Sequence, residues 1–166
     1  MIQRDMRYVF ALFTLLLGLT AAAAAQDAAV SLGVRNGDKA VTLTADRLAA
    51  LSRHTVEARD ERETVTYEGV RLIDVLMQTG VTFGQTLRGP RLASYVVAGS
   101  PDGFRVVIAL AEIDPDFAAR EALVADRRNG MPLPGRDGPL QLIIPADNHH
   151  ARWVRHLTTL AIQTAP

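Results

Sequence analysis

The sequence contains no cysteine, so neither a disulfide nor a thiolate-bound metal is available to this chain. Several enzyme motifs are also missing: the hydrolase GxSxG, the Walker phosphate loop, the dinucleotide-binding GxGxxG and the zinc-binding HExxH do not occur. The serines have no histidine and acid beside them in a recognisable pattern. No internal repeat or low-complexity linker divides the chain. Stability must therefore come from a buried core and from hydrogen bonds.

The first 25 residues have the three-part pattern of a secretory signal peptide. Arg4 and Arg7 give a basic start, residues 9–19 form an apolar core, and residues 21–25 are alanines. The apolar stretch is short for a span of a bilayer. We therefore expect cleavage after Ala25, export to the periplasm and a mature domain over residues 26–166, with one hydrophobic core. An uncleaved membrane anchor is the alternative.

Charge gives no reason to expect a polyanionic partner. The chain holds 18 basic and 18 acidic residues. Two of the basic residues and one of the acidic residues lie in the predicted signal peptide, so the mature domain has a net charge of −1. This balance does not favour binding to nucleic acid or to an anionic membrane. After the signal, the apolar run 140–144 is too short to span a membrane, which predicts a soluble domain.

Hydrophobic periodicity predicts an α+β fold in which strand pairs alternate with short helices. We expect a first hairpin at 30–34 and 39–43 around Asn36-Gly37, followed by a short helix that is capped by Thr44 and has Leu48, Ala49 and Leu51 on its apolar face. A second hairpin is expected at 55–59 and 64–67, and then a helix over 67–76 that is followed by Gly80. A loop at 82–91, two buried strands at 93–98 and 104–108, and a helical turn at 110–113 complete the expected order. Solvated side chains are expected in the acidic run 57–63 and at Arg127 and Arg128, within a hairpin turn at 126–130.

The segment Pro145 to His156, PADNHHARWVRH, concentrates hydrogen-bond donors and one aromatic face. Trp153, the one tryptophan, can stack on a flat heterocycle or can be an ordinary core residue. The guanidinium groups of Arg152 and Arg155 can bind a phosphate or a ring carbonyl, or can be solvated. We expect no metal at the histidines (His149, His150 and His156), because neighbouring side chains of an extended segment point to opposite faces and no cysteine completes a ligand set.

Four segments follow, in order and spacing, those of the sulfite-oxidase-like molybdopterin-binding family: YEGVRLIDVLMQTGV (67–81), SPDGFRVVIALAEIDPDF (100–117), LVADRRNGMPLP (123–134) and RWVR (152–155). The chain resembles this family over about residues 67–162. The resemblance implies a single domain with the family's mixed-sheet fold and pterin pocket. Catalytic members hold molybdenum through a cysteine thiolate, so for this chain the resemblance implies a pterin pocket without molybdenum. The chain also departs from the family near Asp137, where a histidine is frequent, and this weakens the expectation of redox activity.

The resemblance also implies which residues contact the ligand. By position these are His150, Arg152, Trp153 and Arg155. A pterin presents donors on its amino-pyrimidinone edge, so its site needs a carboxylate or amide acceptor. The candidate acceptors are Asp147 and Asn148, followed by Asp102 and Asp126. We identify no catalytic residue.

Three functions from different classes remain open. The first is a periplasmic, non-catalytic pterin-binding protein that senses a reduced pterin, unphosphorylated or in the form of molybdopterin. Such a protein would relay occupancy to the periplasmic domain of a membrane signalling partner, as similar cysteine-free members do for enzymes of cyclic di-GMP. The second is a molybdopterin-dependent oxidoreductase or its subunit, with a metal held without thiolate. The third is an interaction module with a vestigial pocket. Whether the protein is an enzyme stays open, and the missing cysteine argues against it.

Overall fold

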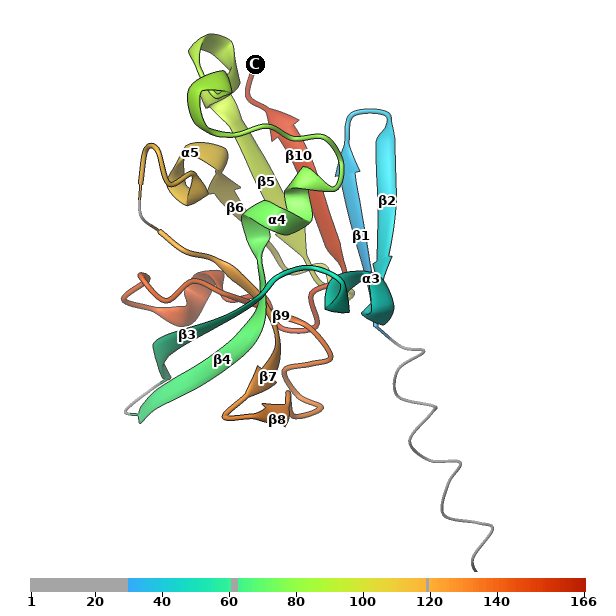
Figure 1. The fold of residues 1–166 in the computed structure, drawn as a ribbon, viewed down its shortest axis with the longest axis vertical. Coiled ribbons are helices and arrows are strands. Elements are labelled where there is room, and N and C mark those ends of the chain that lie inside the picture. Colours follow the sequence, from blue (N-terminus) through green and yellow to red (C-terminus); the bar gives the residue numbers. More distant parts are fainter. Residues whose placement is uncertain (1–29, 61–62, 119) are drawn as a thin grey trace, which may run out of the picture. The chain divides into compact units, whose positions relative to one another are not determined.

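The computed structural model describes residues 30–60, 63–118 and 120–166. Within these ranges the chain forms two five-stranded sheets connected by short helices (Figure 1). No helix among the described residues is long and apolar enough to cross a membrane. The predicted signal peptide lies outside the described residues.

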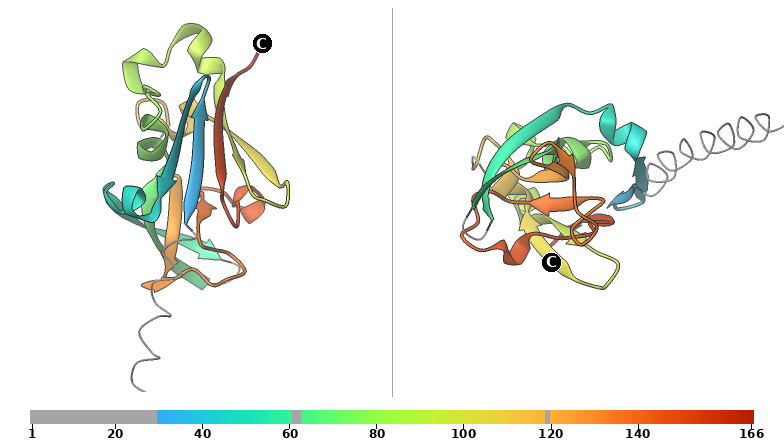
Figure 2. Two further views of the ribbon diagram at one scale, coloured as in Figure 1. Left: turned by 90° about the vertical axis from the view of Figure 1, so that its right-hand side faces the viewer. Right: turned by 90° about the horizontal axis from the view of Figure 1, so that it is seen from below.

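The first sheet has the order β2-β1-β10-β5-β6. Its strands are β1 (Ser31–Asn36), β2 (Lys39–Thr44), β5 (Ser94–Gly99), β6 (Arg105–Ala109) and β10 (Thr159–Thr164). The final strand β10 lies beside the first, parallel to β1 and antiparallel to β5 (Figures 1 and 2). Because one pairing is parallel and the others are antiparallel, the sheet is mixed.

The second sheet has the order β3-β4-β7-β8, with β9 also paired to β7. Its strands are β3 (Arg53–Asp60), β4 (Glu63–Arg71), β7 (Leu123–Arg128), β8 (Met131–Pro132) and β9 (Gln141–Ile143). A bulge between Glu68 and Gly69 shifts the β4–β7 register, so that Tyr67 lies directly opposite Arg128. Glycine is required at position 69, because a Cβ there would lie 2.1 Å from the carbonyl oxygen of Val124.

Short helices connect the strands: α3 (Ala45–Ala49), α4 (Leu72–Met77), α5 (Leu110–Ile113), and the 3-10 turns η1 (Gly84–Thr86), η2 (Gly89–Ala93) and η3 (His150–Arg152). Leu72, Val75 and Leu76 of α4 are completely buried. Burial of each of these side chains is worth about 1.5–3 kcal/mol. The Asn36 amide of β1 donates to the Thr79 carbonyl just after α4, which ties the end of this helix to the first sheet.

The α+β class and most elements are confirmed, including both hairpins and the turn of α5. Thr44 takes the N-cap position of α3 but makes no side-chain cap hydrogen bond, and only Leu48 of the expected apolar face is buried. Residues 67–71 continue β4, so the helix expected over 67–76 begins at Leu72. The expected loop 82–91 contains η1 and the beginning of η2.

One further expectation was wrong at strand level, and another was confirmed with narrower bounds. The strand at 104–108 is not buried on both faces: β6 is an edge strand, and Val107 is 55% exposed. An edge strand covered on one face needs apolar residues only at alternate positions. The turn expected at 126–130 is confined to Asn129 and Gly130, which have φ values of 50° and 77°. Such paired positive φ angles are typical of a two-residue hairpin turn.

Candidate functional site

A cavity of about 1050 Å³ lies where the end of the β3–β4 hairpin, the β5–β6 turn and the segments around residues 137 and 153 meet. Charged, hydroxyl and aromatic side chains form most of its wall. The lining residues are Asp60, Glu63, Tyr67, Ser100, Asp102, Phe104, Arg128, Arg136, Asp137, Gln141, His150, Ala151, Trp153, Arg155 and His156.

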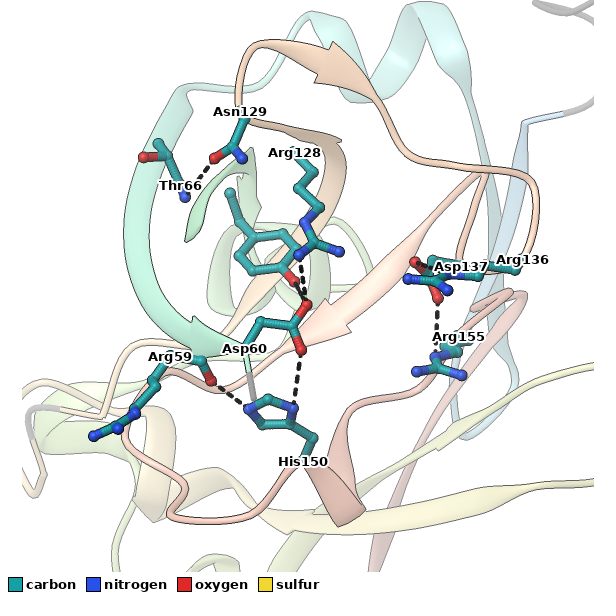
Figure 3. Close-up of polar contacts among 10 residues, drawn as sticks. Arg59, Asp60, Thr66, Arg128, Asn129, Arg136, Asp137, His150 and Arg155 are labelled. Atoms are coloured by element: carbon teal, nitrogen blue, oxygen red, sulfur yellow. Dashed lines mark hydrogen bonds and ion pairs between the residues drawn. The ribbon is translucent and has the colours of Figure 1, made fainter. Parts of the chain in front are cut away.

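Asp60, at the end of β3, is the centre of a polar cluster in this wall (Figure 3). Arg128 Nη2 lies 2.8 Å from its Oδ2, and the Tyr67 hydroxyl donates to the same oxygen at 3.4 Å. His150 Nδ1 lies 3.4 Å from its Oδ1. The pairing of Tyr67 with Arg128 across β4 and β7 brings both residues to the same carboxylate. The cluster therefore fixes three strands and η3 around one side of the cavity.

The Tyr67 hydroxyl is held in its neutral form. Burial raises the pKa of Tyr67 to about 12, and the negative charge of Asp60 adds to the effect, whereas Arg128 opposes it. Loss of the phenolic proton would place an anion in a buried position beside a carboxylate. Tyr67 consequently donates a hydrogen bond to Asp60 throughout the physiological pH range.

Trp153 is a buried wall residue whose polar and aromatic contacts are already satisfied within the chain. Its Nε1 donates to the Ile144 carbonyl at 3.1 Å, and its ring packs edge-to-face with that of Tyr67 at a centroid distance of 5.6 Å. The His150 ring stacks on the indole at 3.8 Å with an interplanar angle of 16°. His150 in turn donates from Nε2 to the Arg59 carbonyl (Figure 3). One face of Trp153 is thus covered by His150 and is not available to a ligand.

Asp137 is the residue with unmet hydrogen-bonding capacity. It lines the cavity and is only 4% exposed, and among the described residues its Oδ1 is the one buried side-chain polar atom without a hydrogen bond. Arg155 Nε lies 3.0 Å from this oxygen (Figure 3), but its N–H does not point toward it, so the contact is an ion pair without a hydrogen bond. Arg136 Nε is 3.5 Å from Oδ2. A buried acceptor without a donor costs about 1–3 kcal/mol, so this carboxylate favours any ligand that supplies donors.

The cavity has mixed charge. The described residues that line it include four carboxylates and three guanidinium groups: Asp60, Glu63, Asp102, Asp137, Arg128, Arg136 and Arg155. On the β5–β6 turn, hydrogen bonds from the Ser100 hydroxyl and the Phe104 amide lower the pKa of Asp102 and keep it ionised. Each of the three arginines faces one of these carboxylates. Among the described residues of the wall, no cluster of positive charge is left uncompensated.

The structure divides the sequence-predicted residues into two groups. His150, Trp153, Arg155 and Asp102 line the cavity. Arg152 does not line it. Its guanidinium forms a bidentate pair with Asp147 at 2.6 and 2.9 Å, and a third bond to Glu112 of α5 at 3.1 Å. The hydrogen bond to Asp147 is the main cause of the raised pKa of Arg152.

The candidate acceptors lie elsewhere, apart from Asp102. Asp147 and Asn148 line a second cavity of about 560 Å³, which also borders His150. Asp126 forms a bidentate pair with Arg53 on the second sheet. A metal site was not expected, and the described residues contain no group of three or more histidines and carboxylates placed to hold an ion.

Sequence reasoning missed Asp60, Tyr67, Arg128 and Asp137. Arg128 was expected to be solvated, as was the acidic run that contains Asp60, but these two side chains pair with each other in the cavity wall. Their juxtaposition depends on strand register, which the local sequence does not specify. For Asp137 the sequence did hold a signal, because an acidic residue stands where the family that the chain resembles frequently has a histidine.

Comparison with known proteins agrees with the resemblance. The family model described as "oxidoreductase molybdopterin binding domain" matches residues 57–166. No functionally curated protein matches the sequence. Among solved structures, the sulfane dehydrogenase SoxCD from Paracoccus pantotrophus is similar with a TM-score of 0.63 and 17% identity. The match covers 82% of this chain but only 38% of the SoxCD chain. The predicted sulfite-oxidase-like molybdopterin-binding fold is therefore confirmed.

Proposed function

Since this chain belongs to the oxidoreductase molybdopterin-binding domain family, we propose that it binds a reduced pterin in the cavity lined by Asp137 and performs no molybdenum chemistry. The observation that carries the proposal is the buried Oδ1 of Asp137, which has no hydrogen-bond donor. A ligand with suitably spaced N–H groups satisfies this oxygen.

The amino-pyrimidinone edge of a pterin is such a ligand. Its 2-amino group and its ring N3–H are parallel donors, and a carboxylate accepts two parallel donors in the same fork geometry that it uses toward arginine. Neither carboxylate oxygen of Asp137 has a strong competing hydrogen bond: Oδ1 has an ion contact with Arg155 but no hydrogen bond, and the contact from Arg136 to Oδ2 is long at 3.5 Å. Both oxygens can therefore take part. Gln141 supplies a side-chain amide in the same wall for the ring carbonyl.

Cavity charge favours an unphosphorylated pterin. A phosphate is bound most strongly by guanidinium or ammonium groups that are not already neutralised. Arg128 is committed to Asp60 at 2.8 Å, and Arg136 and Arg155 both face Asp137. The two further carboxylates of the wall, Glu63 and Asp102, disfavour a dianion and favour hydroxyl donors. The side chain of the bound pterin is therefore proposed to be neutral.

The residues of the cavity fit the pterin but not a thiolate-held molybdenum centre. The chain has no cysteine, so the soft ligand that catalytic relatives are expected to use is missing. When bound to this protein, the pterin supplies a redox-sensitive ring. Residues of this chain bind and orient that ring. An oxidoreductase would need a metal held by oxygen or nitrogen donors, and metal analysis after expression in a host that makes the cofactor tests this. About one molybdenum per chain would refute the non-catalytic proposal.

A periplasmic sensor is the biological role that we propose for this binding. Its support is the signal-peptide pattern of residues 1–25 and the resemblance to cysteine-free members that act with membrane signalling proteins. In this role the pterin-bound form is recognised by the periplasmic domain of a membrane enzyme, for example one that makes or degrades cyclic di-GMP. Co-purification of such a domain from a periplasmic fraction, dependent on added pterin, tests the relay. Fractionation of the protein with the cytoplasm would contradict it.

The decisive binding experiment compares two aspartate variants. Anaerobic titration calorimetry with tetrahydrobiopterin measures the dissociation constant of the wild type, of Asp137→Asn and of Asp126→Asn. A hydrogen bond to a charged group is worth about 1.5–3 kcal/mol, so Asp137→Asn should weaken binding by about 10- to 150-fold. Asp126 is paired with Arg53 outside the cavity, so its variant should bind as the wild type does.

Circular dichroism verifies that both variants are folded. If the wild type does not bind the pterin, the proposal fails and an interaction module becomes the better description. If wild type and Asp137→Asn bind equally, the pterin lies elsewhere.

A further inference from the structure

Arg155 covers the carboxylate that the ligand needs. Its Nε is 3.0 Å from the buried Oδ1 of Asp137, although no hydrogen bond forms. The backbone on either side of this contact is fixed: the His156 amide donates to the Asp137 carbonyl at 3.0 Å, and the Leu157 amide donates to the Leu140 carbonyl at 2.9 Å. Arg155 is therefore held beside Asp137 by its main chain.

The side chain of Arg155 is much less constrained than its backbone. It is 64% exposed, and Asp137 is the one acidic partner found for it among the described residues. The other arginine of the same segment is different, because Arg152 makes three hydrogen bonds and is 30% exposed. An exposed side chain with one ion contact and no directed hydrogen bond is displaced at low cost.

We propose that Arg155 occupies the place of the ligand on Asp137 and leaves when the ligand binds. This inference rests on the proposed function. The guanidinium group and the 2-amino-4-oxopyrimidine edge carry the same arrangement of N–H donors, so one is a substitute for the other at a carboxylate. The pyrimidinone edge is flat and neutral and can form the directed hydrogen bonds that Arg155 does not form. The cavity thus selects heterocycles with an amidine-like donor edge, in competition with its own arginine.

This competition reverses the effect on ligand affinity that the sequence predicts for removal of Arg155. If Arg155 contacted the pterin directly, its removal would weaken binding. If it covers Asp137, its removal frees the carboxylate, and binding becomes tighter. Asp137 is buried, but the arginine end of the pair is 64% exposed and makes no hydrogen bond to it, so we take the contact to be worth no more than an exposed ion pair, up to about 1 kcal/mol. Arg155→Ala should therefore lower the dissociation constant by about two- to five-fold. Asp137→Asn combined with Arg155→Ala should abolish this gain, because the carboxylate is then absent.

Two small probes test the edge selectivity directly. 6-Methylisocytosine carries the 2-amino-4-oxo edge, and 6-methyluracil has an oxygen in place of the amino group. NMR titration of each probe against wild type and Arg155→Ala should show that the variant gains affinity for 6-methylisocytosine only. Arg136→Ala removes an equal charge beside the same carboxylate but leaves Oδ1 covered, so its gain should be smaller. Arg105→Ala, outside the cavity, should show no change.

The outcomes separate this inference from the proposed function. If tetrahydrobiopterin binds the wild type but Arg155→Ala is no tighter, or Arg136→Ala gains as much, Arg155 is not a displaceable cover and the pterin proposal stands. If 6-methylisocytosine shows the gain while tetrahydrobiopterin does not bind, the cover is real and the pterin proposal fails. If no probe binds either form, both are refuted.

Discussion

Substitution of Arg152 by alanine should destabilise the fold without removing a ligand contact. Arg152 connects the segment that follows β9 to α5, through Asp147 and Glu112. Asp147 retains 10% of its side-chain exposure, whereas Arg152 and Glu112 retain 30% and 35%. The pair with Asp147 is therefore largely buried, and the pair with Glu112 is partly solvated.

The expected cost follows from these exposures. Removing one partner of a fully buried ion pair costs about 3–5 kcal/mol, and an exposed pair is worth about 0–1 kcal/mol. Because the arginine itself is nearly one-third exposed, we expect a loss of about 2–3 kcal/mol in the free energy of unfolding. For a domain of this size, with about 4 °C per kcal/mol, the Tm should fall by roughly 8–12 °C.

Urea denaturation followed by circular dichroism measures this loss. A suitable control is Arg120→Ala, because Arg120 faces the same Glu112 at 3.8 Å but is 53% exposed. That variant should lose less than about 0.5 kcal/mol. Folded Arg152→Ala should bind tetrahydrobiopterin as the wild type does. Unchanged stability together with lost pterin binding would refute this reasoning and would support the direct contact predicted from the sequence.

Three further predictions concern other regions. The pKa of Tyr67 is raised from 10.0 to about 12 in the folded state, so the contribution of this residue to stability is complete below pH 10 and is lost as pH rises toward 12. A difference titration at 295 nm between wild type and Tyr67→Phe measures this pKa, and a transition near pH 10 would contradict the prediction. Trp153→Ala should cost about 3–5 kcal/mol of stability in urea denaturation, since a core tryptophan is removed, and a loss below 1 kcal/mol would contradict its buried placement. Mass spectrometry of the exported protein should find Gln26 within a few residues of the N-terminus, and an intact Met1 species as the main form would overturn the predicted cleavage.

Elements with a strong local signal were predictable from the sequence. The Asn36-Gly37 and Asn129-Gly130 pairs lie at hairpin turns, and the α4 residues Leu72 and Leu76 are buried as their spacing predicts. Local rules failed where pairing decides the structure. Residues 67–71 have an ambiguous apolar pattern, and their pairing with β7 makes them a strand. The burial of β6 was overestimated because a position at the edge of a sheet is a property of topology.

The donor-rich segment 145–156 was identified from the sequence, but the direction of each side chain was not. His150 and Trp153 face the cavity, whereas Arg152, between them in the chain, turns to Asp147 and Glu112. In a short 3-10 turn, side chains separated by one or two positions point in different directions, so a segment that forms one wall also supplies the bonds that hold it. Composition indicates such a segment, and only the fold assigns each residue to binding or to support.

Asp137 shows how a departure from a family pattern becomes informative once the structure is known. As a sequence feature it only weakened the expectation of redox activity, because a carboxylate replaces a frequent histidine. In the fold it is buried, lines the cavity and lacks a donor for Oδ1. Burial of a carboxylate is costly unless donors compensate it, and two exposed arginines compensate its charge without completing its hydrogen bonds. The site therefore has a neutralised carboxylate with one acceptor that lacks a directed hydrogen bond. This arrangement favours a neutral donor such as the pterin edge over a cation, because the neutral edge displaces Arg155 alone, whereas a bound cation would also be repelled by Arg136.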